Sequence, residues 1–193
     1  GSVLSPSLFG IYSNELLQKL RKTGVGCHVA GVWMAAIMYA DDLVLLCPDR
    51  VTLQKLVKVC EEYGAEHNLV FSTDPNPAKS KTKCLLFRGK RRVPQPGPVL
   101  LDGEPLPWCS SYEHLGHKLS EDITMNSDAA RAKSSFNSRA DDIRAQLYFA
   151  HPKQKIKAIE LYCSDAYGLN LYDLKSQSAE TLFKAWNRQV KLC

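Results

Sequence analysis

A chain of 193 residues that is 45% hydrophobic can bury the core of one domain, or of one and a half. No apolar run reaches the roughly 20 residues that a membrane span needs, and no basic segment followed by an apolar core marks a secretory signal at the start. The seven cysteines include no C-x-x-C pair, which favours buried free thiols over disulfides or a zinc site. We therefore expect an intracellular protein, nuclear or cytoplasmic, that is not secreted and has no membrane segment.

The net charge of +5 is unevenly distributed. Lys79 to Arg92 holds seven basic residues and no acidic one, the next 38 residues hold one basic and six acidic, and Arg131 to Cys193 holds eleven basic and six acidic. A basic run is most often a solvated surface. It indicates a surface for a polyanion only if another feature of the chain implies nucleic acid.

The first predicted element is a helix that begins at Ser5, a plausible N-cap, followed by Pro6 at the first helical position. Apolar residues then recur at helical spacing: Leu8, Phe9, Tyr12, Leu16 and Leu20. The helix is expected to end at residues 23–26, where two glycines occur.

Two apolar runs, 32–39 and 43–46, flank Ala40-Asp41-Asp42 and predict a β-hairpin with an acidic turn. Because both runs are apolar at nearly every position, we expect both faces of the hairpin to be covered. Two carboxylates at the end of a buried hairpin are costly without a cation or a basic partner. They suit Mg²⁺, as in two-metal phosphoryl transfer, although an inert acidic turn remains the alternative.

The following segments alternate between helix and strand. We expect a helix from an Asp49 cap to Asn68, then short strands at 69–71 and 83–88. A second hairpin is expected at 99–106, with Asp102-Gly103 in its turn, and a single strand at 114–119.

The pattern changes after Glu121, where apolar residues begin to recur by threes and fours. We expect one helix from about Ala129 to Leu147, a second that ends near Gly168, and a third that Ser178 caps. The predicted fold class is therefore α+β: a mixed part, residues 1–121, is followed by an all-helical part, residues 122–193.

Tyr39-Ala40-Asp41-Asp42 resembles the YxDD box of reverse transcriptases. About thirty residues upstream, the segment 1–9 resembles the family's motif B, a QG pair followed by SPxLF. Further motifs follow in the family's order: Asn76, Lys79 and Ser80 resemble motif D, His114-Leu115-Gly116 resembles motif E, and 162–174 resembles the thumb of non-LTR, LINE-like retrotransposon enzymes.

The resemblance implies an RNA-directed DNA polymerase with an incomplete palm, an antiparallel sheet with packed helices, before a helical thumb. Asp41 and Asp42 would be ligands of the two Mg²⁺ ions of the complete enzyme. Lys79 would be the motif D lysine that donates a proton to departing pyrophosphate, with a plain surface lysine as the alternative.

The same resemblance implies an RNA template, a DNA primer and deoxynucleoside triphosphates as partners. The residues expected at the template and nucleotide are Gly1, Ser5, Pro6, Tyr39 and Ala40. The primer grip would be His114, Leu115 and Gly116, and the thumb residues expected along the duplex phosphates are Arg131, Lys133, Arg139 and Arg144.

The sequence starts within motif B, so motif A, with the aspartate that bridges the two metals, and the fingers are expected in a missing N-terminal part of the polymerase. We therefore expect little or no polymerase activity from this chain alone, and an unpaired strand edge at 32–38. The alternatives are a non-catalytic nucleic-acid-binding remnant of a retrotransposon, a decayed transposon product and, more distantly, an unrelated metal-dependent nuclease.

Overall fold

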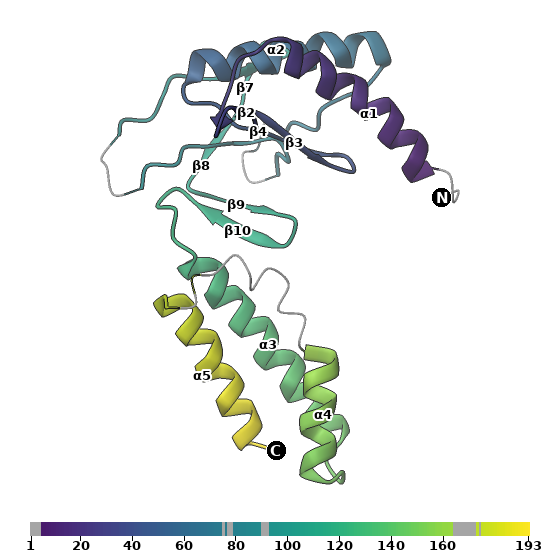
Figure 1. Ribbon diagram of the computed structural model, residues 1–193, viewed down its shortest axis with the longest axis vertical. Helices are drawn as coiled ribbons and strands as arrows, with labels where there is room; N and C mark the ends of the chain where they lie inside the picture. Colours follow the sequence, from purple (N-terminus) through teal and green to yellow (C-terminus); the bar gives the residue numbers. More distant parts are fainter. Residues whose placement is uncertain (1–4, 75, 77–78, 90–92, 164–172, 174) are drawn as a thin grey trace. The chain divides into compact units, whose positions relative to one another are not determined.

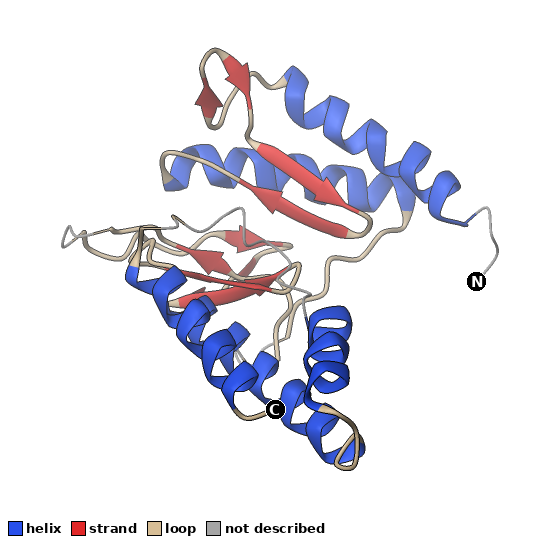
Figure 2. Ribbon diagram, turned by 60° about the horizontal axis from the view of Figure 1, so that its bottom comes forward, coloured by secondary structure: helices blue, strands red, loops and turns tan. Residues whose placement is uncertain are grey.

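The computed structural model describes residues 5–74, 76, 79–89, 93–163, 173 and 175–193 (Figure 1). They form two compact units, Gly1–Cys84 with Pro94–Trp108 and Leu85–Val93 with Cys109–Cys193. Helices and short antiparallel strand pairs occur in both units, so the predicted α+β class is confirmed (Figure 2). The division into palm and thumb at residue 121 stays a prediction.

The first unit has a layer of two helices, α1 (Ser5–Lys22) and α2 (Arg50–His67). The caps of α2 match the sequence prediction: the Asp49 side chain accepts from the Thr52 N–H, and Asn68 adopts a left-handed conformation at the C-cap. The Tyr63 hydroxyl of α2 donates to the Tyr12 carbonyl of α1 at 2.7 Å. This bond fixes how the two helices pack.

Strand pairs complete the first unit. They are β1 (His28–Val29) with β2 (Val32–Trp33), β3 (Ala36–Tyr39) with β4 (Asp42–Leu45), and β6 (Leu100–Leu101) with β7 (Glu104–Pro105). A further pair, β5 (Cys84–Leu85) with β8 (Trp108–Cys109), lies where the chain passes from one unit to the other. The predicted Asp102-Gly103 turn is confirmed, because both residues have positive φ angles, 52° and 81°.

The core of the first unit lies between the helices and the strands. Its buried residues are Leu16, Leu20, Ala35, Leu56, Cys60 and Tyr63, and Val57, Cys84, Val99, Leu101 and Leu106 form a second cluster on α2. Burial raises the pKa of Cys60 to about 12. The prediction of buried free thiols is confirmed for Cys60, Cys84 and Cys163, whereas the other four cysteines are only partly buried.

Two strand predictions in the first unit are wrong. Residues 69–71 are not a strand, and the strand expected at 83–88 is reduced to Cys84–Leu85. The Leu69 N–H instead donates to the Gly64 carbonyl, and a Cβ on Gly64 would lie 2.8 Å from the Leu69 carbonyl oxygen. The chain after α2 therefore folds back tightly over the helix end, where it cannot pair as a strand.

The second unit contains β9 (Ser111–His114), β10 (His117–Ser120), α3 (Asn126–Gln146), α4 (Pro152–Cys163) and α5 (Gln177–Lys191). The single strand predicted at 114–119 is wrong, because these residues belong to an antiparallel hairpin. The prediction that Ser178 caps the last helix is also wrong. Ser176 caps α5 through the Ala179 N–H, while buried Ser178 donates its hydroxyl to Asn126.

The core of the second unit joins its three helices. Ala140 of α3 packs with Ile159 and Cys163 of α4, and Trp186 of α5 lies against the same cluster. No helix within the described ranges is both long and apolar enough to cross a membrane.

Candidate functional site

The acidic turn closes the β3–β4 hairpin. Tyr39 pairs with Asp42 across the strands, so Ala40 and Asp41 form a two-residue turn, with Ala40 at a φ of 51°. Positive φ at this position is what a tight hairpin connection requires, although alanine adopts it with strain. Asp42 is therefore the first residue of β4, whereas the sequence analysis placed it in the turn.

The pleat of the hairpin separates two faces, because successive side chains of a strand point to opposite sides. The face toward α1 and α2 carries the residues that pack on the core, Ala36, Met38, Leu43 and Leu45. The outer face carries Tyr39, 64% exposed, and Asp42.

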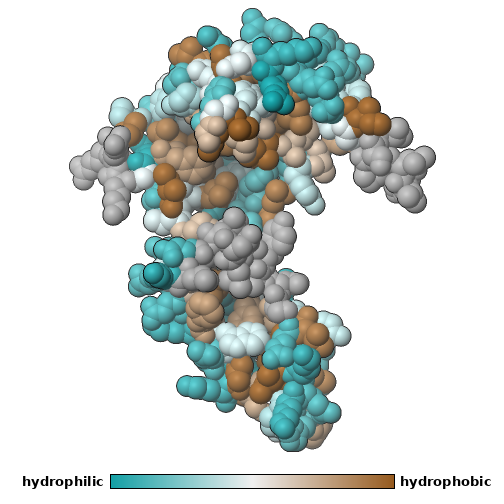
Figure 3. Space-filling view, in the orientation of Figure 1, coloured by the Kyte–Doolittle hydropathy of each residue, from teal (hydrophilic) through white to brown (hydrophobic). Residues whose placement is uncertain are grey.

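The prediction that both hairpin faces are covered is wrong. Ile37 and Tyr39, on the outer face of the hairpin, are exposed, and Figure 3 shows brown apolar groups at the surface below the helical layer of this unit. The physical reason is that helices cover only one face of the hairpin (Figure 1). The unpaired edge predicted at 32–38 is confirmed for 36–38 among the described residues, because β3 pairs only with β4, and it is wrong for Val32–Trp33, which pair with β1.

The Asp41 and Asp42 side chains are exposed, and neither makes a hydrogen bond or ion pair within the described part of the chain. Two carboxylates without protein partners are suitable oxygen donors for a hard divalent cation, which can complete its shell with water and phosphate. The chain thus fits part of a divalent-metal site. The described residues contain no group of three acidic, His or Cys side chains that could bind a metal by themselves.

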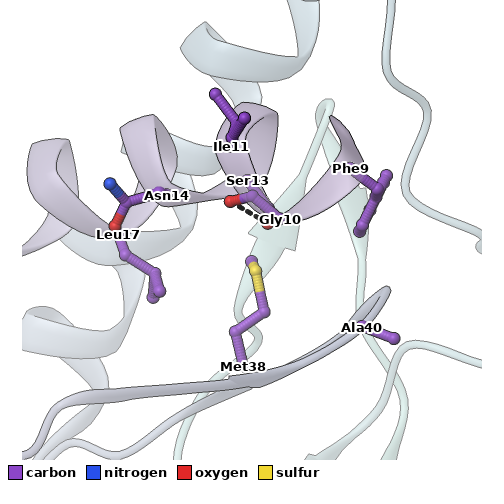
Figure 4. A pocket seen from close by; sticks show the side chains of 8 residues that line it. All are labelled: Phe9, Gly10, Ile11, Ser13, Asn14, Leu17, Met38 and Ala40. Atoms are coloured by element: carbon purple, nitrogen blue, oxygen red, sulfur yellow. Dashed lines mark hydrogen bonds between the residues drawn. The ribbon is translucent and has the colours of Figure 1, made fainter. Parts of the chain in front are cut away.

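An open hollow of about 680 Å³ lies between α1 and this hairpin. Residues of one side of α1 line it, together with Met38 of β3 and Ala40 of the turn. The α1 residues are Phe9, Gly10, Ile11, Ser13, Asn14 and Leu17. Figure 4 shows the Met38 side chain pointing toward α1, and Ala40 at the end of the hairpin. The hollow therefore reaches the residue next to Asp41.

The motif B residues are only partly described. Ser5 and Pro6 begin α1, as the sequence predicts, but Gly1 lies outside the described residues. Tyr39 and Ala40 lie at the hairpin end, so of the predicted template and nucleotide residues these two are brought to the acidic turn.

Lys79, the predicted motif D lysine, lies in a polar turn. The Lys79 backbone N–H donates to the Asn76 carbonyl at 2.9 Å. The neighbouring Ser80 is buried, and its hydroxyl donates to the Thr82 carbonyl. The Lys79 side chain is exposed, and within the described residues no hydrogen bond or ion pair joins it to the Asp41 turn.

The predicted primer grip forms the turn of the β9–β10 hairpin. Leu115 and Gly116 are its two central residues, both with positive φ, 48° and 78°. His114 is the last residue of β9 and pairs with His117. The three motif E residues are therefore brought together in one tight turn.

Asp128 holds this hairpin against the first turn of α3. Its carboxylate is 1% exposed and accepts the Lys118 N–H at 2.8 Å and an Arg131 N–H at 3.1 Å, and it lies 3.1 Å from His117 Nδ1. Arg131 also donates to the Gly116 carbonyl. We call Asp128, His117, Lys118 and Arg131 the Asp128 cluster.

Sequence reasoning missed Asp128. The available signal was an acidic residue in the first turn of a helix, where the helix dipole favours negative charge, one turn before Arg131. A second acidic residue, Asp122, lies between the hairpin and α3. Hydrogen bonds from the Ser120 hydroxyl and from Thr124 lower the pKa of its carboxyl group.

The four thumb residues predicted for duplex contacts all lie on α3. Arg131 is bound to the Asp128 cluster and Arg144 pairs with Asp141, while Lys133 is half-buried and Arg139 is exposed. Most of the other predicted thumb segment, 164–172 and 174, lies outside the described residues.

Comparison with known proteins gives one result. A family model described as reverse transcriptase (RNA-dependent DNA polymerase) matches residues 1–119. No curated protein and no solved structure matches the chain. The match agrees with the family that the motifs resemble, and the assignment to LINE-like, non-LTR enzymes stays a prediction.

Proposed function

Because the chain belongs to the reverse transcriptase (RNA-dependent DNA polymerase) family, we propose that it contributes the metal-binding hairpin to the polymerase site of a retrotransposon enzyme. The general activity of the family is RNA-directed DNA synthesis from nucleotides on a primed template, with divalent metal ions. The observation that carries the proposal is the Asp41 turn, where two carboxylates that have no partner among the described residues lie at the end of a hairpin anchored on the core.

In this proposal Asp41 and Asp42 bind Mg²⁺, which neutralises phosphate charge and favours phosphoryl transfer when bound. Mg²⁺ suits the site because it takes one or two carboxylates and keeps other positions for water and substrate phosphates. The anchored strands keep the two carboxylates in place before substrate arrives, which lowers the cost of ordering them.

The hollow between α1 and the hairpin is the proposed place for the nucleotide or the template base beside it. Met38 and Leu17 give it an apolar wall, and Ala40 connects it to the acidic turn. Tyr39, on the outer face with Asp42, is proposed to contact the primer terminus. Lys79 is proposed to donate a proton to the leaving pyrophosphate.

We propose that this chain alone has little polymerase activity. The described residues bring no third acidic side chain to Asp41 and Asp42. Two-metal transfer needs ligands that hold both ions in one geometry, and two carboxylates are a weak basis for that. A further carboxylate, from motif A, is proposed to complete the site.

The test is Mg²⁺-dependent extension of a DNA primer on an RNA template. We would compare this chain with a version extended upstream through motif A, each with its Asp41→Asn variant. We expect activity in the extended chain only, and at least a hundredfold loss on Asp41→Asn.

Asp102→Asn is the matched control. It removes an exposed carboxylate from another two-residue hairpin turn of the same unit, at a positive φ that asparagine tolerates. Activity that survives Asp41→Asn would refute the metal role. Strong extension by the present chain would refute its proposed dependence on a further carboxylate.

The second candidate is a non-catalytic nucleic-acid-binding chain, favoured by the basic side chains of α3 and of the segment 79–88. It predicts salt-dependent duplex binding by the extended chain without nucleotide incorporation at any Mg²⁺ concentration.

A further inference from the structure

The turn that joins α3 to α4 (Figure 1) carries two neighbouring aromatic residues whose side chains are exposed. Phe149 is 98% exposed and Tyr148 71%, and their rings lie edge to face with centroids 5.0 Å apart. Burying an aromatic side chain is strongly favourable, so two fully presented rings indicate a surface that another molecule covers. We call Tyr148 and Phe149 the aromatic pair.

The backbone under the aromatic pair is well ordered by hydrogen bonds. The Leu147 N–H donates to Ile143 and the Ala150 N–H donates to Leu147, both at 2.9 Å. His151 begins α4 as a cap, since its N–H donates to the Gln154 side chain and its carbonyl accepts the Gln154 N–H. The rings are therefore presented by a fixed turn, which lowers the entropy lost on binding.

Positive charge lies beside the rings. The Lys155 ammonium group is 5.9 Å from the centre of the Tyr148 ring, and Lys153, two residues earlier on α4, is exposed. The acidic residues on these two helices are Asp128, Asp141, Asp142 and Glu160, of which Asp128, Asp141 and Glu160 are paired with Arg131, Arg144 and Lys157. The first turn of α4 adds the positive end of the helix dipole.

We propose that the aromatic pair stacks bases of single-stranded nucleic acid while Lys153 and Lys155 contact its phosphates. Every base has a flat face that an aromatic ring can stack on, and such contacts are made with unpaired bases. The positive charge favours this polyanion over an apolar protein surface. The inference rests on the proposed function only for the class of partner, nucleic acid, and it adds a single-strand site to the predicted duplex contacts of α3.

The test is the affinity of the whole chain for a fluorescently labelled purine-rich single-stranded RNA, measured by anisotropy over a range of salt. We expect Phe149→Ala to weaken binding about tenfold, Phe149→Trp to retain it, and Phe149→Leu to resemble Phe149→Ala. Replacing both lysines with glutamine should make the fall of the logarithm of the binding constant with the logarithm of salt concentration shallower, by about 1.4 in slope. Phe149→Ala should leave this slope unchanged.

Phe183→Ala is the matched control, because Phe183 is an exposed aromatic residue on α5 of the same unit. A strand that keeps the sugar–phosphate backbone but lacks bases should bind wild type and Phe149→Ala equally. Wild-type affinity of Phe149→Ala for the purine-rich RNA would refute the proposal. Equal losses on the strand without bases would refute it as well.

Anionic lipid vesicles provide a second comparison. Vesicle binding that needs Phe149, without binding of the RNA, would overturn the proposal in favour of a membrane surface. The primer-extension assay is independent of these measurements. Single-strand binding by this chain, with no primer extension by the version extended through motif A, would leave this inference standing and the polymerase proposal refuted. Extension by the extended version, with no single-strand binding that depends on Phe149, would refute this inference alone.

Discussion

The acidic hairpin of the first unit and the Asp128 cluster of the second use carboxylates in opposite ways. Asp41 and Asp42 are exposed and have no partners among the described residues, whereas buried Asp128 accepts hydrogen bonds from a strand backbone and an arginine. A carboxylate whose lone pairs are occupied by its own protein holds structure together. One that is anchored but unpartnered remains available to a cation.

Among substitutions that test this comparison, we expect Asp128→Ala to have the largest effect on stability. Asp128→Ala leaves Arg131 and the Lys118 N–H without their buried acceptor, so we expect the free energy of unfolding of the second unit to fall by about 3–5 kcal/mol. Hydrogen exchange of the β9–β10 amides during denaturant unfolding would measure it.

The matched change in the first unit is Asp41→Ala, which removes an exposed side chain without partners among the described residues. We expect it to leave the stability of that unit within about 0.5 kcal/mol. If both substitutions destabilised their units equally, the contrast between the two carboxylate sites would be wrong.

A smaller effect is expected from relieving the two strained turns. Ala40 and Leu115 both have positive φ, 51° and 48°, which costs an L-residue roughly 1–2 kcal/mol. Ala40→Gly and Leu115→Gly should each raise stability by about 1 kcal/mol, since glycine adopts this conformation without strain.

Thermal unfolding of the two variants would measure these gains. Gly116→Ala is the opposite control in the second turn, because glycine there has a φ of 78° and alanine would introduce strain. A loss of stability in Leu115→Gly would mean that the leucine side chain contributes more than the backbone strain costs.

The smallest expected effect is a difference between two helix caps, Asp49 and Ser176, in how their contribution to stability depends on pH. Hydrogen bonds from the Thr52 N–H and hydroxyl lower the pKa of Asp49, the cap of α2. Its stabilisation should be present above the ordinary carboxyl pKa and lost as pH falls through the lowered pKa of the folded state. Ser176, the cap of α5, does not ionise, so its contribution should not change.

Asp49→Asn and Ser176→Ala would test this difference in unfolding experiments at pH 7 and at a pH below the ordinary carboxyl pKa. The gap between wild type and Asp49→Asn should narrow in acid, while the gap for Ser176→Ala stays constant. An acid-independent gap at Asp49 would show that its carboxylate charge does not stabilise the cap.

Local signals were sufficient where one residue decides one conformation. Asp49 and Asn68 indicated both ends of α2, and Asp102-Gly103 indicated a tight turn, because these side chains act on their own backbone. Ser178 failed as a cap prediction because serine is common near helix starts, and the contact that buries it comes from Asn126, 52 residues away.

The missed hairpin at Leu115-Gly116 shows a different limit. Leucine rarely occupies a left-handed conformation, so its sequence gave no turn signal. What holds the turn is the Asp128 cluster, whose contacts span 10 to 15 residues. The acidic hairpin was predicted because two apolar runs flank its short turn. The exposed outer face of this hairpin was not predicted, because the apolar composition of a strand does not indicate which elements will cover it.

The Asp128 cluster also has a mechanical consequence. It binds the β9–β10 turn to the start of α3, a helix of 21 residues, or about 31 Å at 1.5 Å per residue, and the aromatic pair lies just beyond the other end. Helix and hairpin would then act as a lever with a short arm at motif E and a long arm at Phe149. A force on the aromatic pair would therefore act as a torque on the β9–β10 turn, because the Asp128 cluster joins this turn to the start of the helix.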